Sequence, residues 1–175
     1  DINLQDTDNE SVLHYAIKNN NIDVLNYLIE KGADTSIKGR YGRTLLHYAI
    51  KAGNIELCKF LVGKGADVNA KNRDGQTPLH YSIGKGDSSS YPTHNPKPDI
   101  FKFLISKGAK ANVKDEQGCM PLHYAAYCKN IELINLSIDN ASADVINERD
   151  NFGITPLHNV LEHYEEDNYV DVINI

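Results

Sequence analysis

Histidine is the residue type in this sequence with the most obvious chemical potential. Its side chain can act as a general base or a metal ligand near neutral pH. Five histidines each follow a leucine in similar stretches, "SVLHYA", "TLLHYA", "TPLHYS", "MPLHYA" and "TPLHNV". A catalytic site needs one unusual environment, whereas five equivalent environments predict a structural role. These histidines are His14, His47, His80, His123 and His158.

Three cysteines could serve in a metal or redox site: Cys58, Cys119 and Cys128. They are odd in number and irregularly spaced, so the sequence predicts no disulfide framework and favours a reducing compartment, the cytoplasm. The order Cys119, His123, Cys128 matches no common zinc-ligand spacing. The stretches "KGAD" and "GKGD" are interpreted as helix ends and not as phosphate-binding loops. We therefore expect no enzyme, no metal, no cofactor and no small-molecule substrate.

Composition narrows the classes of protein further. The 175 residues are 41% hydrophobic, which is enough for one sizeable folded unit. No apolar run reaches the length of a membrane span, and no signal peptide is visible. The net charge of −6 argues against a nucleic-acid partner. Its distribution is uneven, because residues 38–85 hold nine Lys or Arg and three Asp or Glu, whereas both ends of the chain are acidic.

The helices and loops that position the histidines are predicted from the residues that flank them. In the third copy, Thr77 is a favourable helix N-cap and Pro78 suits the first helical position, so a first helix begins there. In the second copy, "IELCKFLVGKG" predicts an amphipathic second helix that ends at Gly65. The following "DVNAKNRDG" predicts an extended hairpin with Gly75 at its turn. One such unit cannot bury its apolar face alone, so the units are expected to stack.

The Leu-His pairs recur after 33, 33, 43 and 35 residues. This spacing, together with the residues around each pair, resembles the ankyrin repeat, whose signature is T-P-L-H-x-A on a period of 33. The resemblance implies an all-α repeat fold, a solenoid of stacked helix-turn-helix pairs with projecting β-hairpin loops. A single array over residues 1–175 is predicted, with the repeats 6–38, 39–71, 72–114, 115–149 and an incomplete 150–175.

The ends and one insertion depart from this regular pattern. The first residues, "DINLQD", match the end of a repeat, and the last, "YVDVINI", match part of a second helix, so we expect a fragment of a longer chain. The additional residues of the third repeat, 87–96, lie between its two helices. We favour a tolerated loop insertion there, because loops lengthen at little thermodynamic cost. The alternative is an added contact through Tyr91 and His94.

The resemblance also implies roles for individual residues. Each motif histidine is expected to hydrogen-bond with the motif threonine and with the backbone of the adjoining hairpin. A protein partner is expected on the concave face formed by the first helices and the hairpin tips. For the recurring tyrosines the alternative, packing between neighbouring repeats, stays open. The candidate partner-binding residues are Arg40, Tyr41, Arg43, Tyr48, Lys51, Arg73, Gln76, Tyr81, Lys85, Tyr124, Tyr127, Phe152 and Ile154.

Two functions are compatible with these residues. The first is a protein-protein interaction module whose partner carries an acidic patch opposite the basic second and third repeats. The second is a structural spacer within a larger enzyme, toxin or channel. The abundance of Asn, Ile, Lys and Tyr is typical of an AT-biased genome and suggests a pathogen or viral effector, which would act in the host-cell cytoplasm.

Overall fold

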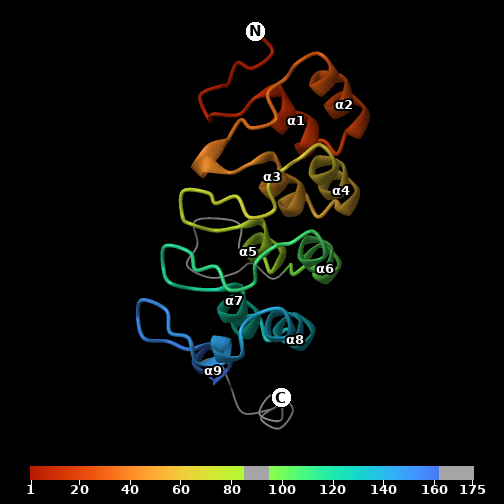
Figure 1. The fold of residues 1–175 in the computed structure, drawn as a ribbon. Helices are drawn as coiled ribbons and strands as arrows, with labels where there is room; N and C mark the ends of the chain where they lie inside the picture. Colours follow the sequence, from red (N-terminus) through yellow and green to blue (C-terminus); the bar gives the residue numbers. More distant parts are fainter. Residues whose placement is uncertain (85–94, 162–175) are drawn as a thin grey trace.

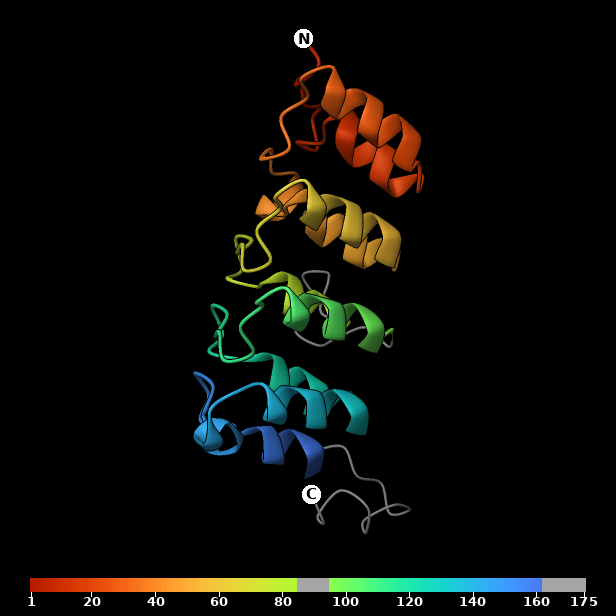
Figure 2. The same cartoon turned by 45° about the vertical axis from the view of Figure 1, so that its right-hand side comes forward.

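The fold is a stack of helix pairs, seen from two sides in Figures 1 and 2. The structure is a computed structural model that describes residues 1–84 and 95–161. Within these ranges the elements follow one another along the stack, and the N-terminus lies at one end of it (Figure 1). The elements are α1 (Val12–Lys18), α2 (Ile22–Glu30), η1 (Arg40–Gly42), α3 (Leu45–Ala52), α4 (Ile55–Gly63), α5 (Pro78–Ser82), α6 (Pro98–Ser106), α7 (Pro121–Tyr127), α8 (Ile131–Asp139), η2 (Ala143–Asn147) and α9 (Pro156–Leu161).

Odd-numbered helices form one row of the stack, and the even-numbered helices pack beside them in a second row (Figure 2). The second residue of each first-row helix is a motif leucine, which is buried in four successive copies, at Leu13, Leu46, Leu79 and Leu122. These leucines belong to one continuous hydrophobic core that runs from repeat to repeat. The predicted all-α repeat architecture is confirmed.

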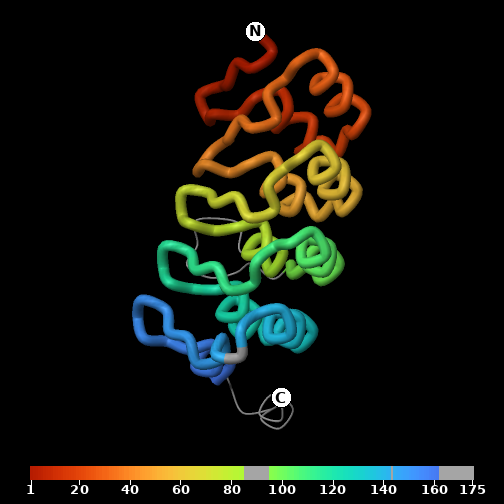
Figure 3. The backbone as a smooth tube through the Cα atoms, viewed as in Figure 1, coloured from red at the N-terminus to blue at the C-terminus, as the bar shows by residue number. Residues whose placement is uncertain are grey.

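Projecting loops connect each second-row helix to the next first-row helix (Figure 3). In residues 1–84 and 95–161 these loops contain no strand, and the only bridge pairs Gln5 with Ser11. Each tip is instead closed by short backbone hydrogen bonds, such as those from Asn72 N to Gln76 O at 3.0 Å and from Gly75 N to Asn72 O at 3.2 Å. In four loops the side chain of the first tip residue accepts from two backbone amides, which fixes the turn. These residues are Asp6, Asn72, Asp115 and Asp150.

Two rows of hydrogen bonds join consecutive loops. The amide of Arg73 donates to the carbonyl of Tyr41 at 2.9 Å, and the amides of Glu116 and Asn151 make the equivalent bonds to the preceding tips. In parallel, a lysine amine in each of three successive loops donates to the carbonyl of the corresponding residue one repeat later. These lysines are Lys38, Lys71 and Lys114. The loop edge is therefore bonded from repeat to repeat by backbone and side chains together.

Glycine is required at the tip of the third loop. Gly75 has a φ of +73°, and a Cβ there would lie 2.8 Å from the backbone nitrogen of Glu116 in the next loop. We expect Gly75→Ala to lower the free energy of unfolding by more than about 2 kcal/mol, because it combines left-handed strain with a backbone clash. Gly65 is the matched control, since its φ is +94° but the space around it is open. Gly65→Ala should cost only about 1 kcal/mol, and equal losses in urea unfolding would contradict the close approach of the loops.

Candidate functional site

His47, His80 and His123 each lie between the start of their own helix and the loop of the next repeat. The Thr77 amide donates to His80 Nδ1 at 3.1 Å, and the Thr77 hydroxyl lies 2.9 Å from the same nitrogen. Because Nδ1 accepts, the ring proton is on Nε2, which donates to the Cys119 carbonyl of the next loop at 3.3 Å. His47 and His123 make the equivalent contacts to later carbonyls at 3.2 and 3.3 Å. The imidazole thus connects two repeats.

Burial keeps the rings of His14, His47 and His123 neutral. Loss of water lowers the pKa of His47 to about 3 and that of His14 to about 4, and it also lowers the pKa of His123. His14 differs from the others because its Nε2 is buried without a hydrogen-bond partner. A buried imidazole whose two nitrogens are both engaged is not available to an external substrate, so His47, His80 and His123 act in the scaffold.

Three recurring tyrosines are buried, which corrects the expectation that they line an open surface. Tyr48, Tyr81 and Tyr124 are nearly inaccessible to solvent. Each ring packs edge-on against the histidine of the preceding repeat, with centroids 4.7 Å apart for His14–Tyr48 and for His47–Tyr81, and 5.9 Å apart for His80–Tyr124. The packing alternative is therefore the one that the structure shows, because the preceding repeat covers the ring.

The tyrosine hydroxyls anchor the loops. Tyr124 donates to Asp115, the first tip residue of its own loop, at 2.6 Å, and Tyr81 accepts from Asn72 in the same position at 3.2 Å. Tyr81 also accepts from Arg43 Nε at 2.6 Å. Arg43 and Gln76 were expected to contact a partner, but both are buried within the loops. Their place at the base of the tips, where the next repeat packs, explains this burial.

The remaining candidates are accessible to different degrees. Arg40, Lys51 and Arg73 are exposed, and Phe152 is 78% exposed at the tip of the last loop. Lys85 lies outside the described residues, as do residues 87–94 of the insertion. The structure therefore divides the predicted set into buried scaffold residues and a smaller accessible group. The half-buried members of that group are Tyr41, Tyr127 and Ile154.

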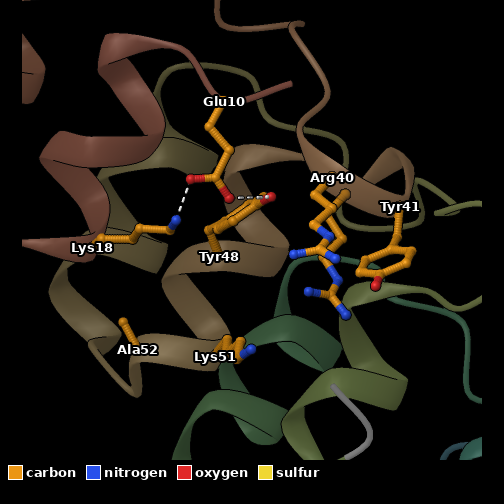
Figure 4. A pocket seen from close by; sticks show the side chains of 8 residues that line it. Glu10, Lys18, Arg40, Tyr41, Tyr48, Lys51 and Ala52 are labelled. Carbon is orange, nitrogen blue, oxygen red and sulfur yellow. Dashed lines mark hydrogen bonds and ion pairs between the residues drawn. The ribbon is translucent and has the colours of Figure 1, made fainter. Parts of the chain in front are cut away.

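One hollow of about 510 Å³ lies between the first two repeats (Figure 4). We call it the basic hollow, because four cationic side chains and one carboxylate line it. The carboxylate, Glu10, accepts from Lys18 Nζ and from the Tyr48 hydroxyl. Figure 4 shows this group on one side of the hollow and Arg40 beside the Tyr41 ring on the other. The cationic residues are Lys18, Arg40, Arg43 and Lys51.

The repeat pattern of the sequence did not predict this hollow, which depends on a residue that departs from the pattern. Gly39 stands where four other loops have Asp or Asn, so the side chain that fixes those turns is missing. A Cβ at position 39 would lie 2.5 Å from the Tyr48 hydroxyl, so glycine lets that ring approach the loop. Tyr48 then bonds to Glu10 of the preceding repeat. Aligning the five loops would have identified Gly39 as the exception.

The thiols of the described residues provide no chemical centre. Burial raises the pKa of Cys58 and Cys119 to about 12 and that of Cys128 to about 11, so these thiols stay protonated at neutral pH. Among the described residues, no group of three or more His, Cys, Asp or Glu side chains could hold a metal ion. None of the helices in residues 1–84 and 95–161 is long and apolar enough to cross a membrane.

Comparison with known proteins agrees with the geometry. A family model for ankyrin repeats, in three copies, matches residues 1–72, 41–92, 53–136 and 89–175. The chain belongs to the ankyrin-repeat family. Ankyrin repeats are generally protein-protein interaction modules and are typically not catalytic. No curated protein matches this ankyrin-repeat chain.

Proposed function

We propose that this ankyrin-repeat chain binds a partner protein on the face formed by its first-row helices and loop tips, which we call the loop face. The observation that supports this best is the charge of that face in the second and third repeats. Arg40, Lys51 and Arg73 project there and are exposed. The positive electrostatic potential of these side chains favours a partner with an acidic patch opposite these repeats. It also accelerates the association of the chain with that partner.

Apolar contact is available at the other end of the loop face. Phe152 is the most exposed large hydrophobic side chain of the described residues, and it lies at a loop tip where the other loops carry polar residues or Tyr41. An exposed aromatic ring at a tip is a common anchor in protein interfaces. The proposal thus includes a basic region at the second and third repeats and an aromatic contact at the fifth.

The burial of Tyr48, Tyr81 and Tyr124 favours a second candidate function. Without these rings the loop face is more polar, and a polar face suits a structural spacer within a larger protein. The two functions differ in one observable property, since a spacer has no partner whose binding depends on Arg40, Lys51 or Arg73.

We further propose a cytoplasmic location. Three free cysteines support a reducing compartment. The AT-biased composition supports an effector of a pathogen or virus that acts in the host-cell cytoplasm. Each part of this proposal is independent of the binding face and is tested by fractionation of the cells that produce the protein.

Capture of the partner from those cells tests the loop face directly. We expect the intact protein to retain a partner that is lost when Arg40, Lys51 and Arg73 are all changed to Glu, because this reverses the field of the second and third repeats. Capture should also weaken as salt rises toward about 0.5 M. The matched control changes three exposed lysines outside the loop tips, Lys59, Lys64 and Lys107, to Glu. Equal capture by both variants would contradict the proposal.

A further inference from the structure

Lysines at one position of three successive loops share a hydrogen bond but differ in their electrostatic surroundings. The Nζ atoms of Lys38, Lys71 and Lys114 donate to a carbonyl of the next loop at 3.1, 2.9 and 3.0 Å. Lys114 Nζ also lies 2.8 Å from a carboxylate oxygen of Glu148. In residues 1–84 and 95–161, which the structure describes, no Asp or Glu forms an ion pair with Lys38 or Lys71. Within that part of the chain, no carboxylate balances the charges of these two lysines.

The residue next to the accepting carbonyl explains this difference. Glu148 directly precedes the carbonyl that Lys114 bonds to, and Ala70 occupies the same position for Lys38. The backbone is alike at both residues, because each amide donates to the carbonyl three residues earlier, at 3.3 Å for Ala70 and 3.4 Å for Glu148. The fifth loop thus supplies its own carboxylate at a place where the third loop has only a methyl group.

An ammonium group that bonds to a carbonyl still has donors for a carboxylate, since it carries three N–H groups. Lys114 demonstrates this, because it makes both contacts at once. Lys71 resembles Lys38, with the apolar Val113 in the position of Glu148. Two successive lysines are therefore arranged to take a carboxylate that the neighbouring loops do not provide.

A groove of about 560 Å³ between the second and third loops, which we call the loop groove, leaves space beside Lys38. Lys38, Lys64 and Lys71 line it together with one carboxylate, Asp67. Asp67 accepts from the Asn69 amide at 2.8 Å and, among the described residues, forms no ion pair with these lysines. The loop groove therefore combines a positive potential with room for an anionic side chain.

From these observations we infer that the loop groove binds an acidic segment of a partner protein, with one carboxylate at Lys38 and another at Lys71, one repeat further along. Each carboxylate takes the position that Glu148 takes beside Lys114. The inference rests on the proposed function, because it adds a second contact surface for the same acidic partner. The loop groove and the loop face use different cations, so each surface can be tested without the other.

Titration with an acidic peptide tests the inference without knowledge of the partner. We would add capped Glu-Gly-Glu-Gly-Glu-Gly-Glu-Gly, whose flexible backbone presents carboxylates at many spacings, to the intact ¹⁵N-labelled chain. The amides of Lys38, Ala70 and Lys71 should shift and saturate at a dissociation constant of about 1 mM, because charged contacts open to water are individually weak. The amides of Lys114 and Glu148, which are already paired, should not shift. The same peptide with Gln in place of Glu should produce no localised shifts.

A variant that supplies the carboxylates from the chain itself gives the sharpest comparison. Ala70→Glu combined with Val113→Glu should pair Lys38 and Lys71 internally and weaken peptide binding at least about tenfold. The matched control is Ala52→Glu combined with Ser106→Glu, which makes the same change of charge at two exposed helix positions. It should weaken binding less than about threefold, through long-range charge alone. A thermal melt of each variant verifies that it is folded.

The opposite change is expected at the fifth loop. Glu148→Gln removes the internal partner of Lys114, so the amide of Lys114 should now shift with the peptide, and binding should strengthen about twofold or more. A Lys114 resonance that stays unchanged in this variant would show that the position beside the lysine amine does not take an external carboxylate.

Two further results would overturn the inference, namely equal binding of the Glu and Gln peptides or equal losses in the two double variants. Failure of the proposed function is distinguishable from these. If capture of the partner ignores the loop-face charges while the Glu peptide still shifts the amides of Lys38 and Lys71, the loop groove stands and the loop face is rejected.

Discussion

The Tyr81→Ala variant is expected to lose about 3–5 kcal/mol of its free energy of unfolding, as truncation of a buried aromatic side chain does. The ring is only 2% exposed and packs on His47. Its removal leaves a cavity between two repeats and takes away the hydroxyl that Arg43 and Asn72 bond to. Because each repeat is stabilised by its neighbours, the loss should spread beyond the third repeat. Urea unfolding followed by circular dichroism measures it.

Tyr15 is the matched control for this prediction. It occupies the same position in the first repeat, and its ring is 48% exposed. Tyr15→Ala should therefore cost less than about 1.5 kcal/mol, since a half-exposed ring has less apolar burial to lose. Tyr81→Phe separates packing from hydrogen bonding, and loss of the hydroxyl that accepts from Arg43 and Asn72 should cost about 1–3 kcal/mol. Similar losses for Tyr15→Ala and Tyr81→Ala would contradict the described packing.

Acid is expected to destabilise the protein at pH values above those at which its carboxylates titrate. His14 and His47 have folded-state pKa values of about 4 and about 3, compared with 6.5 for an unburied histidine. Between these values the unfolded chain binds more protons than the native one, so the free energy of unfolding falls as the pH falls below 6.5. At a pH of about 5.5, each of these two histidines should cost about 1.4 kcal/mol. His123, whose pKa is also lowered, adds to the loss.

Urea unfolding at pH values of about 7.5, 6.5 and 5.5 tests this directly. His47→Ala provides the internal control, because it should be less stable than the parent at the highest pH but should lose less stability on acidification. The slope of the free energy of unfolding against pH should differ between the parent and His47→Ala by the equivalent of about one proton in the range below about pH 6.5. A free energy of unfolding that stays constant over this whole range would show that these histidines are not buried in the neutral form.

Much of the fold could be predicted from the sequence because the same local signals occur in every repeat. In the third copy Thr77, Pro78 and the motif leucine indicate the start of a first-row helix. The leucine recurs in every copy, so a copy that lacks the threonine or the proline is identified by comparison with the others. The described loops contain no strand beside their turns, so the expected β-hairpins stay a prediction. The signal used, a glycine at the tip such as Gly75, specifies a turn but not a ladder of hydrogen bonds beside it.

Site residues were harder to predict, because exposure is a property of neighbouring repeats and not of one motif. The position of Tyr81 on a helix is consistent with either an open face or the interior, and only the preceding repeat decides between them. Arg43 carries a charge that favours the surface, yet its Nε bonds to the buried Tyr81 hydroxyl. The basic hollow depends on Gly39, which lacks the Asp or Asn side chain of the other four loops. A residue that matters because it has no side chain gives no chemical signal in the sequence.

The bonded loop edge gives the stack unequal mechanical properties. Backbone bonds such as Arg73 N to Tyr41 O, reinforced by Lys71 and Lys114, resist stretching along that edge. Between second-row helices the ties include exposed side-chain pairs such as Lys102–Glu132, which exchange readily with water. Bending of the stack should therefore change the distances between second-row helices, while the distances between consecutive loops stay nearly constant. The distance between consecutive loop tips is then constant even when the curvature of the stack varies. A partner that contacts several tips must therefore match this fixed spacing.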